Sequence, residues 1–400
     1  MAIQLIEIIF SVYFSYTSFY TFILSLAGRI GKKEASSGHI SFHRVAILIP
    51  AFKEDGVILD VANSYNNLDY PSHQFDVFVI SDSMKKETIL QLKKIVNVIE
   101  VSFEVSTKVK SLNKALSEIG DDYDIVVIND ADNIPESNFL KRISFQFSKG
   151  NKAIQGQRMA KNTNTPFAIL DAISEMINNH IYRKGFNALR LSSGLIGSGM
   201  AFEIHLLKKL LLVNQAVGGF DKVLQLSIVE RGIFIKYDEE AIVFDEKTES
   251  SGTFRKQRKR WLSSQLKYFF KSFKTSFAQL FKGNLNYFNL AFLATIMQPR
   301  ILVFAVLTFF CILSSIIRTD FIWGWWMLFA IYISAMILSI PSYYYQKPFF
   351  LALIRIPVLI LNLLLALFGV KNSDKAFIHT DHQTKGVQNI FYEKWKRSNQ

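Results

Sequence analysis

An uninterrupted apolar run that ends in two carboxylates constrains the fold of this chain more than any other stretch. Residues 125–128 are all isoleucine or valine, and Asp130 and Asp132 follow them within four positions. A short apolar run between polar residues predicts a strand that is buried on both faces, as in a parallel sheet covered by helices. Because open α/β sheets bind ligands beyond the carboxyl ends of their strands, we expect both carboxylates to face a binding site.

Further strands and helices alternate around this run. The pattern predicts strands over residues 45–50, 75–80, 99–104 and 152–158 and a last strand that reaches residue 245, with helices over 85–98, 110–119, 167–184 and about 221–230. Such alternation favours a parallel, doubly wound sheet. Glu54 and Asp82 also follow strands, so three strand ends carry acids and predict a nucleotide pocket. The glycine fingerprints of nucleoside triphosphatases and of dinucleotide-binding folds are missing from the sequence, which argues against both classes.

The spacing of Asp130 and Asp132 favours a divalent cation. Mg²⁺ binds oxygen ligands and is usually held by one or two carboxylates together with phosphates of the substrate. The pair therefore suggests a metal that carries a nucleotide diphosphate. The alternative is that one aspartate only caps the following helix.

The N-terminal stretch is long and apolar enough to cross a membrane. Residues 2–27 exceed the roughly 20 residues that a spanning helix needs, and Arg29, Lys32 and Lys33 follow them directly. A cleaved signal peptide is disfavoured, since no basic segment precedes the apolar one. The positive-inside rule then places the N-terminus outside the cell and residue 29 onward in the cytoplasm.

The C-terminal third predicts further membrane contacts. Residues 262–281 form a basic, Phe-rich amphipathic pattern that is typical of a helix in the membrane interface, with a core-packed helix as the alternative. Residues 301–317 and 321–340 predict a membrane hairpin, whereas residues 287–297 are ambiguous. Residues 349–370 contain Arg355 and Pro357, and because a central arginine is costly in a bilayer we expect an in-plane helix there. This choice leaves the basic C-terminal tail in the cytoplasm.

Composition narrows the function classes. The formal net charge is +13, but the basic residues flank apolar segments, which fits a membrane surface and gives no indication of nucleic-acid binding. Cys311 is the single cysteine, so the chain forms no intramolecular disulfide. We find no internal repeat of the kind that many transporters show.

An ordered set of motifs resembles the membrane-bound family 2 glycosyltransferases, the group that contains cellulose, chitin and hyaluronan synthases and many bacterial polysaccharide enzymes. The resemblance covers about residues 43–380. It is carried by the segment 45–54, Asp82, the segment Lys110-Ser-Leu-Asn113, the Asp130-Ala-Asp132 pair, the Gly197-Ser-Gly199 turn, Asp221 and the Gln257-Arg-Lys-Arg260-Trp261 run, which matches the family's Gln-x-x-Arg-Trp motif.

This resemblance implies a role for each matched residue. Glu54, Asp82 and Asn113 would contact the nucleotide, Lys110 would approach the diphosphate, and Asp132 with Asp130 would bind Mg²⁺ or Mn²⁺. Asp221 would be the general base, and the remaining matched residues would surround the diphosphate and the acceptor, namely Gly197, Gly199, Gln257, Arg260 and Trp261. One departure concerns the family's Glu-Asp pair, because Phe220 stands where its first acid is expected.

The resulting expectation is an inverting, metal-dependent hexosyltransferase with a GT-A-type, Rossmann-like α/β domain and terminal membrane helices. It would work at the cytoplasmic membrane on a nucleotide-sugar donor and a glycan or lipid-linked acceptor, with possible partner subunits of a polysaccharide pathway. The domains are expected at residues 1–28 (transmembrane helix), 29–261 (catalytic), 262–298 (interfacial), 299–340 (membrane hairpin) and 341–400 (in-plane helix and tail).

Two alternatives to this function stay open: a polyprenyl-phosphate sugar transferase and a catalytically silent nucleotide-binding subunit. The segment 377–382 admits two further interpretations. One is a solvated loop in the position of a gating segment, and the other is a pair of metal ligands, His379 and His382.

Overall fold

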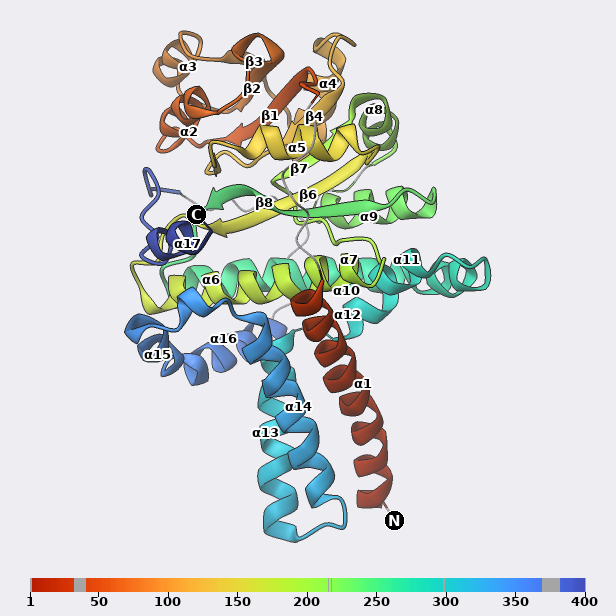
Figure 1. Ribbon diagram of the computed structural model, residues 1–400. Helices are drawn as coiled ribbons and strands as arrows, with labels where there is room; N and C mark the ends of the chain where they lie inside the picture. Colours follow the sequence, from red (N-terminus) through yellow and green to blue (C-terminus); the bar gives the residue numbers. More distant parts are fainter. Residues whose placement is uncertain are drawn as a thin grey trace.

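Figure 1 shows a domain with a central sheet, a layer of long helices beneath it and three helices that protrude from that layer. This computed structural model describes residues 2–31, 41–214, 216, 218–297, 299–368 and 382–399. The strands are β1 (Val45–Phe52), β2 (Phe75–Asp82), β3 (Asn97–Val101), β4 (Ile125–Ile128), β5 (Ile134–Pro135), β6 (Ala153–Ala160), β7 (Met200–Glu203) and β8 (Ile235–Asp245).

The helices fall into two groups along the chain. Up to the last strand they are α1 (Ala2–Ile30), α2 (Ile58–Ser64), α3 (Lys86–Leu92), α4 (Lys108–Glu118), α5 (Phe139–Ser148), α6 (Pro166–Asn179), the π-helical η3 (His180–Gly185), α7 (Phe186–Ala188), α8 (Ile204–Leu212) and α9 (Phe220–Glu230). After it come α10 (Ser251–Phe281), α11 (Leu285–Phe288), the π-helical η4 (Asn289–Leu293), α12 (Ala294–Ile296), α13 (Arg300–Ile317), α14 (Ile322–Ser339), α15 (Lys347–Leu353), α16 (Ile356–Phe368) and α17 (Tyr392–Asn399). Short 3₁₀ turns cover Tyr65–Asn67, Ser72–Gln74 and Ser342–Tyr344.

The sheet is mixed, whereas the sequence predicts a parallel one. Its order is β3-β2-β1-β4-β7-β6-β8-β5, and β1 pairs in parallel with both β2 and β4. The prediction is wrong for β7, which runs antiparallel between β4 and β6. Gly197 and Gly199 precede β7 with φ of 89° and 60°, a backbone region that favours glycine and turns the chain back. Four residues are too few to give a periodic signal, so this strand escaped prediction.

Alternate residues of the central strands enter two hydrophobic cores, one on each face of the sheet. Ile47, Ile49 and Val127 pack on one face, with residues of α2 and α5. Leu48 and Ile128 pack on the other face, with residues of α4 and α8. Burial on both faces explains why these strands are apolar throughout, as the sequence analysis assumed.

Two predicted helix boundaries are wrong for tertiary reasons. The helix expected over residues 85–98 ends at Leu92, because residues 97–101 form the edge strand β3 beside β2. The helix expected from Lys110 begins at Lys108, where the hydroxyl of Thr107 accepts the N–H of Lys110 at 3.2 Å and caps it.

The basic motif and the amphipathic segment belong to one helix. α10 runs without a break over 31 residues, so the domain boundary expected at residue 261 falls inside it. The helix lies in the layer below the sheet, and α16 packs against it through Leu262, Leu363 and Ala366 (Figure 1).

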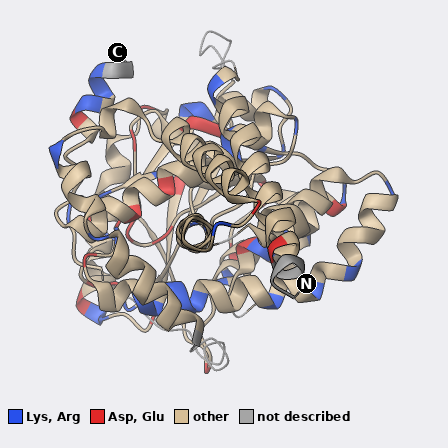
Figure 2. Ribbon diagram, turned by 90° about the horizontal axis from the view of Figure 1, so that it is seen from below, with Lys and Arg blue, Asp and Glu red and all other residues tan. Residues whose placement is uncertain are grey.

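Three helices are long and apolar enough to cross a membrane by length and composition: Glu7–Ile30, Arg300–Ile317 and Ile322–Ser339. They protrude on the same side of the domain (Figure 1). Seen from that side they are largely free of charge, whereas Lys and Arg lie on the elements around them (Figure 2). α15 and α16 are bent by 49° at the break between them, and whether they lie in the membrane plane stays a prediction.

Candidate active site

A cavity of about 550 Å³ opens where the carboxyl ends of the parallel strands meet α9 and α10. Nine of the residues singled out in the sequence line it: Glu54, Asp82, Asp130, Asp132, Gly197, Asp221, Gln257, Arg260 and Trp261. We call the strand-end side the donor wall and the side formed by α9 and α10 the acceptor wall. The structure therefore brings carboxylates from three strand ends and a basic helix to a single space.

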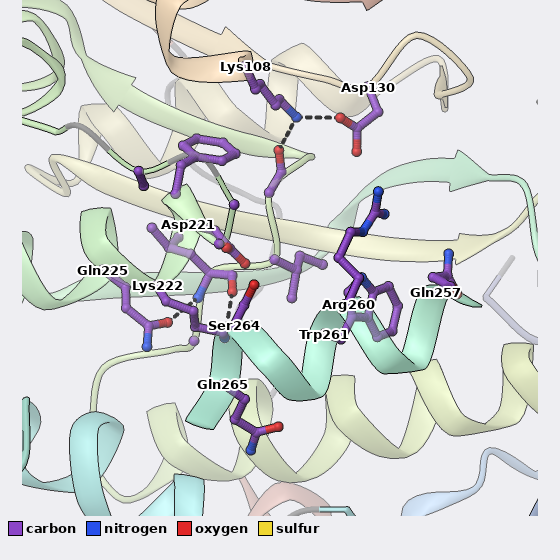
Figure 3. Close-up of a pocket in the computed structure, with 18 of the residues that line it drawn as sticks. Lys108, Asp130, Asp221, Lys222, Gln225, Gln257, Arg260, Trp261, Ser264 and Gln265 are labelled. Carbon is purple, nitrogen blue, oxygen red and sulfur yellow. Dashed lines mark hydrogen bonds and ion pairs between the residues drawn. The ribbon is translucent and has the colours of Figure 1, made fainter. Parts of the chain in front are cut away.

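Lys108, which the sequence analysis overlooked, is the lysine of the donor wall. Its ammonium forms an ion pair with Asp130 and donates to the carbonyl of Gly197 at 2.7 Å (Figure 3). Lys110, the predicted residue, lies two positions later on α4 and is rotated by about 200° around the helix axis. Its ammonium donates instead to the carbonyl of Val105 at 2.8 Å, outside the cavity.

The other two predicted residues that do not line the cavity support the fold. Asn113 donates from its side-chain amide to the carbonyl of Leu211 at 3.0 Å and so ties α4 to α8. Gly199 lies behind the cavity wall, where a Cβ would approach Val243 Cγ2 to 2.9 Å. Asn113 thus joins two helices, and Gly199 permits a close approach to a neighbouring side chain. Neither residue lines the cavity.

Asp132 is buried and held by the backbone. Its Oδ2 accepts the N–H of Glu246 at 2.8 Å, and its Oδ1 accepts from the Asn133 amide at 3.1 Å. Burial raises the pKa of this carboxyl, but His382, the Glu246 N–H and Lys161 outweigh burial and lower it. Asp132 is thus an anion that the protein keeps inside the domain.

The C-terminal segment completes the donor wall. The ring Nδ1 of His382 lies 3.1 Å from both carboxylate oxygens of Glu54. Burial lowers the pKa of His382, but Asp132 and Glu54 raise it to about 10, so the ring is protonated and donates to Glu54. The solvated loop expected here is wrong for His382, which lines the cavity. Residues 377–381, including His379, lie outside the described part of the chain.

Five charged side chains that line the cavity form one buried network. Arg158 contacts Glu175 at 2.9 Å and Asp245 at 3.2 Å, and Arg183 contacts Glu175 at 3.2 Å. Lys247 adds a contact of 2.6 Å to Asp245. Burial raises the pKa of Glu175, yet the cations around it hold that pKa well below its ordinary value. Asp132 and Asp130 also interact electrostatically with Arg158, so the network is continuous with the strand-end carboxylates.

The acceptor wall depends on a close contact between α9 and α10. Tyr268 of α10 donates its hydroxyl proton to the carbonyl of Gly218 at 2.7 Å. Gly219 directly precedes α9 with φ of 68°, and a Cβ there would lie 2.8 Å from the Tyr268 ring. Both its positive φ and this approach require glycine. The contact places Asp221 in the first turn of α9, facing the cavity (Figure 3).

The residue before Asp221 takes up a structural role in this chain. Phe220 is buried, and the Lys108 ammonium lies 5.2 Å from the centroid of its ring. The next residue, Lys222, donates to the carbonyl of Leu195 at 3.3 Å, and burial lowers the pKa of its ammonium. The missing first acid of the family's pair is therefore replaced by an aromatic ring that packs against a cation.

The basic motif on α10 places four side chains along the cavity, those of Gln257, Arg258, Arg260 and Trp261. Arg260 extends toward Asp130 (Figure 3), and although Asp130 raises its pKa, the larger effect of burial lowers it. Trp261 stands beside Arg258, whose guanidinium lies 4.5 Å from the indole centroid and forms an ion pair with Asp171 of α6. Arg258, which also lines the cavity, thus links Trp261 to α6, a role that no motif spacing indicated.

The residues present fit a divalent cation that is shared with a substrate. Among the described residues no group of three or more His, Cys, Asp or Glu side chains is placed to hold a metal. Asp132 is ionised, and the Asp130 side chain is partly exposed at the cavity. Two carboxylates that leave the other positions to phosphate oxygens match the way Mg²⁺ binds beside nucleotides. A closed metal site made by these residues alone is not what the geometry shows.

Comparisons with known proteins give a family and several structures of related shape. Residues 43–264 match the model of a family described as "Glycosyltransferase like family 2". One similar structure is a mannosyltransferase from Pyrobaculum calidifontis in complex with GDP-Man and Mn²⁺, at 16% identity over 82% of this chain and 97% of that one, with a TM-score of 0.48. Another is glucosyl-3-phosphoglycerate synthase from Mycobacterium tuberculosis with Mn²⁺ and UDP, at 14% identity over 54% of this chain and 79% of that one, with a TM-score of 0.37. A third is TarS from S. aureus with UDP-GlcNAc, at 16% identity over 52% and 59%, with a TM-score of 0.36.

Proposed function

The chain belongs to glycosyltransferase family 2, and from that membership we propose that it transfers a sugar, with inversion, from a nucleotide-sugar donor to a hydroxyl of a glycan or lipid-linked acceptor at a membrane surface. The observation that carries the proposal is the single cavity in which strand-end carboxylates face Asp221 and Arg260. The reaction needs both sides, since one wall binds the nucleotide and the other presents the acceptor.

On the donor wall, Glu54 and Asp82 contact the base and ribose. Asp82 Oδ2 is a buried acceptor without a hydrogen-bond partner among the described residues, and a ribose hydroxyl or a base N–H supplies the missing donor. Lys108 and Arg260 neutralise the diphosphate. Asp132 and Asp130 would hold Mg²⁺ or Mn²⁺, which would add positive charge beside the leaving diphosphate.

On the acceptor wall, Asp221 is the general base. It takes the proton of the acceptor hydroxyl while the oxygen forms a bond to the anomeric carbon and the diphosphate departs from the opposite side. One displacement of this kind inverts the anomeric centre and forms no covalent intermediate. Trp261 and Gln257 border the space in which the acceptor sugar lies.

Three protruding apolar helices support a position at the cytoplasmic membrane. In this arrangement α1, α13 and α14 cross the bilayer, with the N-terminus outside and the catalytic domain in the cytoplasm. A polysaccharide pathway with partner subunits fits this location, as does the narrower likeness to cellulose, chitin and hyaluronan synthases. A polyprenyl-phosphate sugar transferase is the second candidate, because it would use the same donor wall at the same surface.

The test is nucleotide release by the detergent-purified chain from a panel of UDP- and GDP-sugars, with and without Mg²⁺ or Mn²⁺. We expect metal-dependent turnover of one donor, abolished in Asp132→Ala. Asp122→Ala, an exposed aspartate outside the cavity, is the matched control and keeps full activity. If calorimetry detects no nucleotide binding and no donor is turned over, the transferase proposal is rejected.

A further inference from the structure

The cavity does not end at Asp221 but continues past α10 toward the protruding helices. Beyond α10 it is lined by Leu290 and Ala291 of η4, Ala294 and Thr295 of α12, and Leu363 of α16. Pro299, which directly precedes α13, also lines it. We call these residues, together with Gln265, Tyr268, Phe269 and Ser272 of α10, the floor of the cavity.

The floor lies where two candidate membrane helices meet the domain. From α1, Tyr13 donates to the carbonyl of Ile296 at 2.8 Å and Tyr16 to that of Leu293 at 3.1 Å. On its other side the floor ends at Pro299, next to Arg300, the first residue of α13. If these helices cross a bilayer, the floor is the part of the cavity nearest to its hydrocarbon.

The chemistry of the lining changes along the cavity. The donor wall carries acids and bases in close contact, such as Asp130, Asp132 and Lys108. Among the described lining residues on η4, α12 and α16 and over residues 262–272 of α10, Lys267 is the one charged side chain. The charged lining residues Asp171, Glu175 and Arg183 lie on α6 and η3, outside the floor. Apart from the amide of Gln265, the floor is apolar or hydroxylic, and its Ala and Ser side chains are small, which leaves width for a chain of methylene groups.

We propose that the acceptor is a membrane lipid with a hydroxylated head, whose alkyl or prenyl tail occupies this floor while the head reaches Asp221. The inference deepens the proposed function and rests on it. An apolar tail needs no hydrogen bonds from the wall, and burying it there removes it from water. A free polysaccharide would find few free donors along this surface, because the side-chain donors of Gln265, Tyr268, Ser272 and Thr295 are already bonded to backbone carbonyls.

Photolabelling in vesicles tests the site without knowledge of the natural acceptor. The full chain is reconstituted in phosphatidylethanolamine and phosphatidylglycerol vesicles that contain a little dodecyl β-glucoside with a diazirine in its alkyl chain. We expect label on the peptides that hold residues 268–272 and 290–295. A farnesyl β-glucoside with a diazirine forms the second arm, and the probe that labels the floor more strongly identifies the tail as straight or prenyl.

Two variants narrow the floor from opposite sides. Ala294→Phe fills it from α12, and Gln265→Trp fills it from α10, so that one remains informative if the other fails to fold. Each should lower labelling about tenfold, as expected when a few methylene groups lose their contacts. Ile296→Phe, on α12 but outside the lining, is the matched control and keeps wild-type labelling.

The outcomes separate this inference from the function on which it rests. Label confined to the exposed faces of α13 and α14, or label unchanged in both narrowing variants, overturns the lipid site. Donor turnover is measured on the same vesicles as nucleotide diphosphate release. Wild-type turnover without floor labelling rejects the lipid acceptor alone, whereas floor labelling with neither donor turnover nor nucleotide binding rejects the transferase.

Discussion

The donor wall and the acceptor wall meet in one cavity but are held in place by different forces. On the donor wall, carboxylates follow strands that are locked by the backbone, as where the N–H of Asn129 donates to the carbonyl of Leu48 at 3.1 Å. The acceptor wall depends on side-chain packing between two helices, with Tyr268 against Gly218 and Gly219. The comparison teaches that the geometry of the donor wall follows from the strands of the sheet, whereas that of the acceptor wall depends on a few contacts between α9 and α10.

The largest expected effect concerns Asp221 on the acceptor wall. Asp221→Asn removes the general base but leaves every donor contact in place, so kcat should fall about 10³-fold, within the usual range for such a group. The dissociation constant of the nucleotide, measured by calorimetry, should stay unchanged. Glu230→Gln, at the other end of α9 and outside the cavity, is the control.

Two results would contradict this separation of the donor wall from the acceptor wall. Equal turnover in Asp221→Asn and wild type would move the base to another residue. Weaker nucleotide binding in the variant would show that the two walls are not independent.

The second effect concerns the stability of the donor wall. Glu175→Gln leaves Arg158 and Arg183 buried without their shared anion, which should lower the free energy of unfolding by about 3–5 kcal/mol. The matched control is Glu239→Gln, which breaks a partly exposed pair with Lys184 and should cost about 0–1 kcal/mol. Denaturation of the purified chain in detergent measures both, and similar losses would mean that the buried network is not what holds this wall.

The pH dependence of this loss has a defined sign. The pKa of Glu175 is lowered in the folded chain, so its contribution is present above its ordinary value of 4.5 and is lost as the pH falls below it. The gap between wild type and Glu175→Gln should therefore narrow on acidification below pH 4.5.

The smallest expected effect tests whether Lys108 or Lys110 contacts the diphosphate of the donor. Lys108→Gln removes the cation beside Asp130 and should raise the donor KM about tenfold, the usual value of a charge-assisted hydrogen bond. Lys110→Gln, on the same helix but outside the cavity, should change KM by less than about twofold. Steady-state kinetics at fixed metal concentration compare the two, and a larger effect at Lys110 would restore the assignment from motif spacing.

The strand-end residues could be placed from the sequence because an apolar run with acids after it has few interpretations. Glu54, Asp82, Asp130 and Asp132 all line the cavity as expected. Lys108 was missed since a shift of two residues on a helix reverses its direction, and the cap at Thr107 sets that phase. The network around Glu175 was missed because its partners lie far apart in the chain and no local pattern joins them.

By itself, the sequence determined the alternation of strands and helices, the acids at strand ends, the basic motif ending in Trp261 and the apolar helices. These are local properties, since periodicity and side-chain chemistry act over a few residues. Only the tertiary structure decided that β7 runs antiparallel, that His382 contacts Glu54 and that the cavity continues from Asp221 to η4, α12 and Pro299 before α13. Each of these depends on segments that meet across long stretches of chain, where packing and not local propensity selects the partner.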